Sequence, residues 1–551
     1  MKLNASFVAL IAILLASYAS LRAFDDNKPD SIVNTNNSNA IGGLRLERNL
    51  LVEQEINAII SQWFDDELER QGGKFKSHGW WPWGVNGFDY DNDGDIDLYL
   101  SHHGKPGGKL LTNLLQQKGA LSFKPFPQIR LPGADDNPEF FDFNGDGFLD
   151  IAGLSDEAKA PYLFNLQGQA FERKTQHTLR PLSRFNQLTD FNQDGFLDID
   201  GGRKGKWLYI PSEQRFKRDK TPQTAQISDL PTDYQDFAAK RKKASSKNRF
   251  LTINYLVHAQ VYRKQLYNHQ APLDLNHDGH TDILINGAGS YGGEYHSTVL
   301  AYTPNGYVKA NKRLKLPDNA LIIYVGDINL DGRQDVLMAG DNGGLFINSP
   351  TGFIEKRNGL SKFISRRAPY AIRAFAVDFD LDKDPDFVLN NPRKRETEIY
   401  ENLGNGDFKR IFKSFSWEAN AIWITDINND SMYDVIIGGA GKQFKKSVAV
   451  LVNQSKAKGN FLTLYPRASF PNLYAVNVLM KVACNDTTLM REPYWHGAPL
   501  IFSIGSSSQC DVEIDYGNNQ IVTFDKLKAN QTYTLYQNQK KVVGYQPAHS
   551  E

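Results

Sequence analysis

Acidic side chains recur in this chain at a spacing that suits the binding of a hard cation. A nine-residue segment with the pattern Asp-x-(Asp/Asn)-x-Asp-x-x-x-Asp occurs seven times, and five copies have Gly at position 6. Oxygen ligands at positions 1, 3, 5 and 9 of a tight loop are the kind that Ca²⁺ prefers. The predicted ligands of the seven loops are Asp89, Asp91, Asp93 and Asp97; Asp142, Asn144, Asp146 and Asp150; Asp190, Asn192, Asp194 and Asp198; Asp274, Asn276, Asp278 and Asp282; Asp327, Asn329, Asp331 and Asp335; Asp378, Asp380, Asp382 and Asp386; Asp426, Asn428, Asp430 and Asp434.

The sixth and seventh loops depart from this pattern at position 6, where Lys383 and Ser431 replace Gly. A left-handed backbone is expected at this position, and Gly adopts it most easily. We therefore expect up to seven Ca²⁺ sites, of which the last two are weaker. An EF-hand is excluded, because position 12 never carries the bidentate Glu. Asp and Asn also favour turns without any metal, but carboxylates this close together repel one another unless a cation neutralises them.

Short apolar runs precede and follow the loops, so each loop is expected to join two β-strands. Ile322–Val325 and Val435–Ile437 are examples, rich in β-branched residues. Farther along, segments such as Asn402–Phe408 carry the Asn and Gly of a hairpin turn. The loops begin 53, 48, 84, 53, 51 and 48 residues apart, which leaves room for three or four strands per repeat. Seven such repeats predict an all-β fold, a seven-bladed β-propeller with calcium loops.

At these residues the chain resembles the FG-GAP/VCBS repeat family, whose calcium-loop propellers are similar to integrin α-chain heads. Residues 459–540 resemble the ASPIC/UnbV domain that follows such repeats in the cartilage acidic protein family. This second resemblance rests on Gly459–Leu464, Ile501–Gly505 and Val512–Gly517, while Ala468–Leu473 replaces the Gly- and Arg-rich segment of that domain. It implies a small β-rich domain after the propeller.

The N-terminus predicts export. Residues 1–23 combine Lys2, an apolar segment from Phe7 to Ala16 and small residues, which is typical of a signal peptide cleaved after Ala19 or Ala23. The apolar segment is short for a membrane span, and no second apolar run of spanning length follows. We therefore expect a secreted, extracellular or periplasmic protein without a transmembrane segment in the mature chain.

The expected domain order follows from these boundaries. Residues 24–72 form a disordered tether and then an amphipathic helix from Leu46 to Leu68 that packs on the propeller. The propeller takes residues 73–455, with an insertion at about 205–265, and a tail of residues 541–551 follows the C-terminal domain. Cys484 and Cys510 both lie in that domain, and in an oxidising compartment they predict a disulfide.

Other motifs carry little weight as reactive sites. Gly287–Gly292 fits a dinucleotide pattern, but a strand follows it where the motif requires a helix. Trp80, Trp81 and Trp83 are more typical of packing between blades than of sugar stacking, and His102-His103 of a loop than of a metal site. The sequence has no recognisable nucleophile, zinc or phosphate motif, so no catalytic residue is predicted.

Lys and Arg number 63 and Asp and Glu number 63, so the unloaded chain is neutral, and nucleic acid is not an expected partner. Bound Ca²⁺ would make it cationic, and the insertion adds Lys240, Arg241, Lys242, Lys243, Lys247 and Arg249. We expect a binding or adhesion module for an extracellular protein or for a glycan, including anionic polysaccharides. Two alternatives stay open, a lyase-like polysaccharide-active enzyme and a secreted scaffold or assembly factor.

Overall fold

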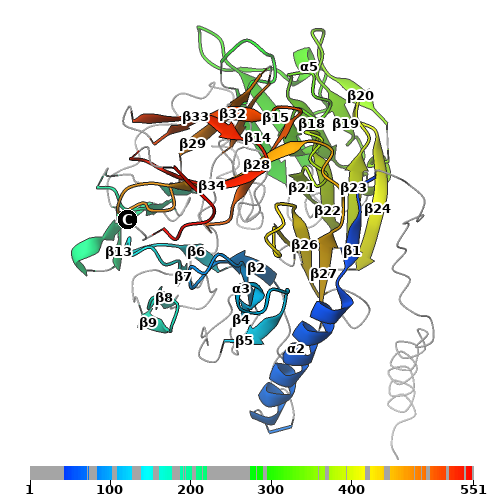
Figure 1. Cartoon of the computed structure of the whole chain (residues 1–551). Coiled ribbons are helices and arrows are strands. Elements are labelled where there is room, and N and C mark those ends of the chain that lie inside the picture. Colours follow the sequence, from blue (N-terminus) through cyan, green and yellow to red (C-terminus); the bar gives the residue numbers. More distant parts are fainter. Residues whose placement is uncertain are drawn as a thin grey trace, which may run out of the picture.

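The computed structural model is all-β, and its repeat region consists of antiparallel sheets that follow one another along the chain (Figure 1). Apolar runs on both sides of the acidic loops form the first and second strands of one sheet, as the sequence predicts, except in the fourth repeat, where residues 220–272 before the loop lie outside the described part of the chain. The third and fourth strands form the hairpin that follows. The structure describes residues 43–70, 72–73, 84–101, 108–126, 138–152, 161–175, 187–189, 192, 194–200, 206–213, 215–219, 273–280, 282–288, 295–357, 359–365, 372–391, 394–415, 422–439, 447–476, 478–485, 487–491, 497–516, 520–538 and 541–548.

Seven of the open sheets correspond to the seven repeats. The first two are β2 (Gly84–Phe88), β3 (Asp97–Ser101), β4 (Lys109–Asn113) and β5 (Phe123–Pro125), then β6 (Glu139–Phe141), β7 (Asp150–Ala152), β8 (Pro161–Asn165) and β9 (Phe171–Thr175). The third and fourth are β10 (Gln187–Thr189), β11 (Asp198–Asp200), β12 (Lys206–Ile210) and β13 (Arg215–Arg218), then β14 (Ile283–Ala288), β15 (Tyr295–Ala301) and β16 (Val308–Lys309). The fifth and sixth are β17 (Leu321–Gly326), β18 (Asp335–Ala339), β19 (Leu345–Ile347) and β20 (Ile354–Lys356), then β21 (Arg373–Val377), β22 (Asp386–Asn391), β23 (Glu396–Asn402) and β24 (Phe408–Phe415).

The seventh sheet contains strands from both ends of the repeat region. It consists of β25 (Ile422–Thr425), β26 (Asp434–Gly438), β27 (Val448–Asn453) and the N-terminal β1 (Leu46–Arg48), which pairs antiparallel with β27. The prediction of a helix from Leu46 is wrong for its first residues, because they supply hydrogen bonds to the open edge of β27. The helix α2 instead spans Leu50–Arg70.

Helix α2 packs across the first and seventh sheets, as expected from its apolar positions. Val52, Ile56 and Ile60 are buried in one core with residues of β2, β3, β25 and β26. The side chain of Asn57 also bonds the backbone of Val448 in both directions, at 2.7 and 3.2 Å. The helix therefore connects the first repeat to the last. Shorter helical segments are α3 (Leu115–Lys118), η2 (Pro211–Glu213), α5 (Asn311–Leu314) and α6 (Ser361–Ile364).

Two further sheets form a C-terminal domain with its own core. One contains β31 (Leu500–Gly505), β28 (Asn460–Arg467), β34 (Gln531–Tyr536) and β35 (Lys541–Val543); the other contains β30 (Thr487–Arg491), β29 (Leu479–Cys484), β32 (Gln509–Asp515) and β33 (Ile521–Lys528). Cys484 and Cys510 are joined by a disulfide inside this core, which agrees with the prediction.

Several predicted features lie outside the described residues. They are the signal peptide, the tether up to residue 42, Trp80, Trp81, Trp83, His102-His103, the basic cluster of the insertion and Asp190 in the third loop. None of the described helices is both long enough and apolar enough to cross a membrane.

Candidate metal centres

The position 9 aspartate links each described loop to its own sheet through hydrogen bonds. In the first loop, Asp97 Oδ2 accepts the backbone N–H of Tyr90 at 3.1 Å, and Oδ1 accepts that of Asn113, at the end of the third strand, at 2.8 Å. The equivalent pair of bonds recurs at Asp150, Asp282, Asp335, Asp386 and Asp434, and Asp198 accepts the bond from the third strand. A carboxylate oxygen has two lone pairs, so these residues retain acceptor capacity for a cation.

The position 1 aspartate shapes the turn of the loop. In the second loop, Asp142 Oδ1 accepts the N–H of Asp146 at 3.1 Å and Oδ2 accepts that of Gly147 at 2.8 Å. Position 6 has positive φ in all seven loops, including 85° at Lys383 and 64° at Ser431. The left-handed conformation expected there is thus present even where Gly is absent.

The first loop brings together carboxylates that have free oxygens. Oxygen atoms of Asp89, Asp91 and Asp97 lie within 4.8 Å of one another. Asp89 Oδ1 and Asp91 Oδ1 are buried and have no hydrogen-bond partner among the described residues. No basic side chain in the described part of the chain forms an ion pair with these three residues, and Asp95 adds a further carboxylate at position 7. This donor set fits a divalent cation.

Burial makes the negative charge of these carboxylates unfavourable. It raises the pKa of Asp89 to about 8, with smaller contributions in the same direction from Asp91 and Asp93. Burial also raises the pKa of Asp142 to about 8 and that of Asp426 to about 7. A bound cation would favour the ionised forms, so metal binding is expected to release protons.

The other loops lack one of these carboxylates, because Asn occupies position 3 in the second, third, fourth, fifth and seventh. There the amide donates to the position 5 aspartate, as from Asn276 to Asp278 Oδ2 at 2.8 Å. The amide oxygen remains on the loop and accepts the N–H of Asp278 at 3.1 Å. The same amide bond to position 5 occurs in the remaining four loops.

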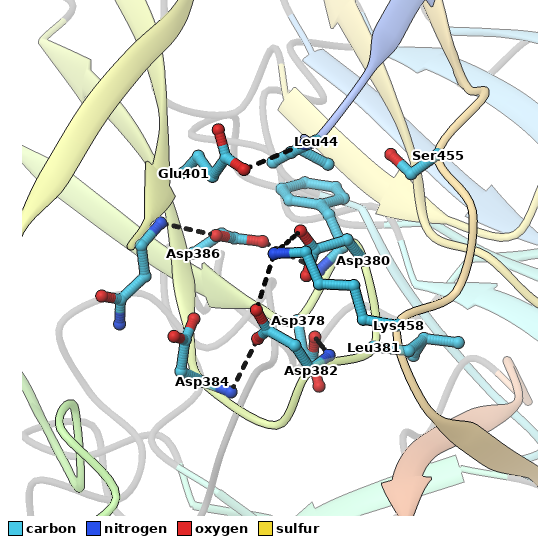
Figure 2. Close-up of polar contacts among 12 residues, drawn as sticks. Leu44, Asp378, Asp380, Leu381, Asp382, Asp384, Asp386, Glu401, Ser455 and Lys458 are labelled. Atoms are coloured by element: carbon cyan, nitrogen blue, oxygen red, sulfur yellow. Dashed lines mark hydrogen bonds and ion pairs between the residues drawn. The ribbon is translucent and has the colours of Figure 1, made fainter. Parts of the chain in front are cut away.

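The sixth loop has the same five alternating aspartates as the first, but it also has a cation of its own (Figure 2). Asp378, Asp380 and Asp382 have oxygens within 4.8 Å of one another. The Lys458 ammonium lies 2.7 Å from Asp380 Oδ2 and 2.8 Å from Asp382 Oδ2. Lys458 was not predicted, since it lies 76 residues from Asp382 in sequence.

A recurring asparagine that the sequence analysis treated only as a turn residue connects neighbouring sheets. The Asn165 amide donates to the Leu149 carbonyl of its own loop at 3.1 Å and to the Tyr90 carbonyl of the preceding loop at 2.6 Å. Asn348, Asn402 and Asn453 repeat this pair of bonds. Asn113 of the first sheet bonds the Ile427 carbonyl of the seventh loop at 3.1 Å. In the sequence, this asparagine is recognisable as an Asn that lies 13 to 19 residues after the position 9 aspartate.

The C-terminal domain is docked directly on several of these loops. Tyr545 Oη donates to Asp89 Oδ2, the position 1 residue of the first loop, at 2.6 Å. Tyr474 Oη donates to the Gly147 carbonyl of the second loop at 3.0 Å. The Arg467 guanidinium lies 5.3 to 5.7 Å from the ring centroids of Tyr474, Tyr545 and Tyr465. This tyrosine cluster could not be predicted from local sequence, because it joins residues far apart in the chain.

Position 6 of the seventh loop and position 4 of the sixth take part in the same docking. Thr463 Oγ1 donates to Ser431 Oγ at 2.9 Å, and Ser503 Oγ donates to the Leu381 carbonyl at 2.8 Å. The Ser431 hydroxyl therefore accepts a hydrogen bond in the domain contact, which Gly could not do.

None of the described residues covers position 6 of the fourth and fifth loops. A Cβ added to Gly279 or Gly332, at position 6, would meet no atom within 4 Å. By contrast, a Cβ on Gly94 of the first loop would lie 3.0 Å from the Tyr545 ring. Leu330, at position 4 of the fifth loop, is 50% exposed. The described loops thus divide into a covered group and an open pair.

Comparison with known proteins identifies the repeats. Residues 89–153 and 274–338 match the family model described as the FG-GAP-like repeat. The chain therefore contains FG-GAP-like repeats, and these two stretches hold four of the acidic loops. None of the curated proteins matches the chain.

Three solved structures show limited similarity. BBS1N, crystallised with ARL6DN and soaked with lead, is 9% identical, with 69% of this chain and 95% of that chain covered and a TM-score of 0.32. The extracellular domain of the putative one component system BT4673 from B. thetaiotaomicron is 9% identical, with 89% and 60% covered and a TM-score of 0.33. The Photorhabdus luminescens Tc holotoxin pore is 11% identical, with 80% and 20% covered and a TM-score of 0.21. TM-scores this low establish no common fold.

Proposed function

We propose that the seven repeat sheets close into a seven-bladed β-propeller stabilised by Ca²⁺ in its acidic loops. The hydrogen bond from Asn113 to the Ile427 carbonyl supports closure, because the same bond elsewhere joins consecutive sheets. The core shared by α2, the first sheet and the seventh sheet supports it as well. A closed ring leaves no exposed sheet edge between the first and last blades.

The observation that carries the calcium proposal is the pair of buried oxygens without partners on Asp89 and Asp91. A buried carboxylate without compensation is costly, and three meet in this loop. Asp89, Asp91, Asp93 and Asp97 would hold the ion, and Ca²⁺ would supply a positive charge in direct contact with these carboxylates, which no ion pair among the described residues provides. Equivalent residues of the second, third, fourth, fifth and seventh loops would hold further ions, with the seventh loop weaker.

We propose that this propeller serves as an exported binding module for a glycan or protein partner. We also propose that the C-terminal domain is of the ASPIC/UnbV type. It contacts the first, second, sixth and seventh loops. Metal in the first, second and seventh of these loops would therefore act on folding and domain docking. No described residue of the C-terminal domain covers the fourth and fifth loops, and the exposed Asp278 and Asp331 put their position 5 carboxylates on that surface.

A glycan array and a pull-down from secreted proteins, each run in calcium and in chelator, test the binding function. The double variant Asp278→Asn/Asp331→Asn is then compared with wild type on the strongest partner. Asp341→Asn is the matched control, because Asp341 is an exposed loop residue outside the nine-residue pattern. We expect calcium-dependent binding that the double variant loses and the control keeps. Binding unaffected by chelator and by the double substitution would contradict the proposal.

A further inference from the structure

The first and sixth loops form a natural matched pair. Each has Asp at positions 1, 3, 5, 7 and 9, a feature that the other loops do not share. In each, three of these carboxylates have oxygens within 4.8 Å of one another. Their ion pairs differ, since none of the described basic side chains forms an ion pair with the first loop, whereas Lys458 pairs with the sixth.

Lys458 is held beside the sixth loop by more than its charge. Its backbone N–H donates to the Asp380 carbonyl at 2.8 Å, which places the residue next to position 3 of the loop. The ammonium then reaches the carboxylates at positions 3 and 5, as Figure 2 shows. Asp380 is buried, with 2% of its side chain exposed, whereas one third of the Lys458 side chain is exposed. The Lys458 ammonium thus contacts two carboxylate oxygens, at positions 3 and 5, that a bound metal ion would need as ligands.

We propose that Lys458 takes the place of the metal ion in the sixth loop, so that this loop is neutralised without calcium. This inference rests on the proposed calcium binding of the other loops. Ca²⁺ binds carboxylate oxygens at about 2.3–2.6 Å, and an ion held by Asp380 and Asp382 would lie within a few ångströms of the ammonium. The two positive charges would repel each other strongly in this partly buried setting.

The contact with Lys458 also connects the sixth loop to the C-terminal domain. Lys458 lies directly before β28, the first strand of the C-terminal domain. The same loop receives the hydrogen bond from Ser503 of β31 to the Leu381 carbonyl. A lysine in place of an exchangeable ion makes this attachment independent of the calcium concentration.

The test compares Lys458→Met, which keeps the aliphatic stem and removes the charge, with Lys456→Met as the matched control. Lys456 is exposed and lies two residues away. Calcium stoichiometry is measured by isothermal titration and equilibrium dialysis, and melting midpoints are measured in calcium and in chelator. We expect Lys458→Met to bind one more Ca²⁺ than wild type, to melt lower in chelator and to recover in calcium, while Lys456→Met matches wild type. An unchanged stoichiometry in Lys458→Met, with no additional recovery in calcium, would overturn the proposal and leave Lys458 a plain ion pair.

A second measurement uses the unmodified protein and does not depend on the folding of a variant. Lysine acylation followed by peptide mass spectrometry compares Lys458 with Lys456 in saturating calcium and in chelator. We expect Lys458 to react more slowly than Lys456 in both conditions. Reaction of Lys458 at the rate of Lys456 in calcium alone would show that the ion displaces the lysine, which contradicts the proposal. Failure of the wild-type protein to bind any calcium would instead refute the proposed function.

Discussion

Replacement of Asp89 by Asn should change stability in opposite directions with and without calcium. In the metal-free protein, burial raises the pKa of Asp89 to about 8, whereas an aspartate in an unfolded chain titrates near about 3.9. The folded state therefore binds more protons than the unfolded state between these values. In this window the group lowers the free energy of unfolding as pH rises.

The expected magnitude follows from this pKa. For one carboxyl group with a folded pKa of about 8, the linkage relation gives a loss of about 2 kcal/mol between pH 6 and pH 8. Asp89→Asn removes the titrating group, so the metal-free variant should gain about this much relative to wild type over the same interval. In calcium the variant loses a position 1 ligand. If free calcium is 100 times the Kd, complete loss of the site costs about 2.7 kcal/mol.

Urea unfolding at pH 6 and pH 8, in calcium and after removal of metal, measures both effects. Asp341→Asn is the control for the change of charge, since Asp341 is exposed. The reasoning is refuted if the metal-free wild type does not lose stability relative to Asp89→Asn as pH rises. It is also refuted if the variant is destabilised equally in both metal conditions.

Three further predictions concern other parts of the molecule. Asn113→Ala removes two buried hydrogen bonds and should lower the free energy of unfolding by about 2 kcal/mol; a loss below about 0.5 kcal/mol in urea titration would argue against a closing role. The double variant Cys484→Ser/Cys510→Ser should lose about 3 kcal/mol, because the bridge spans 26 residues; unfolding at the wild-type urea concentration would contradict this. Asp146→Ala should lower the melting midpoint in calcium more than Asp430→Ala, since the loop of Asp146 has Gly at position 6 and the loop of Asp430 has Ser; equal decreases would show that position 6 has no effect on the site.

The sequence predicted the parts of the site that depend on local spacing. The nine-residue pattern correctly located the loops between strands, and it correctly implied a left-handed backbone at Lys383 and Ser431. Both follow from conformational preferences within a few residues. The pattern could not reveal the hydrogen bond from Thr463 to Ser431, because Thr463 lies in another domain.

The neutralisation of the loops could not be predicted from the sequence, since it depends on residues far away in the chain. Tyr545 is 456 residues from Asp89, and Lys458 is 76 residues from Asp382. The first and sixth loops are alike in their acidic residues, yet among the described residues only the sixth loop forms an ion pair with a lysine. The asparagines that join neighbouring sheets were visible as a repeated residue, but the carbonyl that each contacts belongs to the previous repeat. Charge balance and closure are therefore properties of the assembled fold.

The central claim, that calcium in the acidic loops stabilises the fold, is tested most directly by calcium content measured together with thermal stability. The protein is purified in calcium, dialysed without chelator and analysed for bound metal, and its melting midpoint is then compared before and after chelation. We expect several tightly bound calcium ions per chain and a melting midpoint that falls on chelation and returns when calcium is restored. A protein that carries no calcium after dialysis and melts at the same temperature in calcium and in chelator would contradict it.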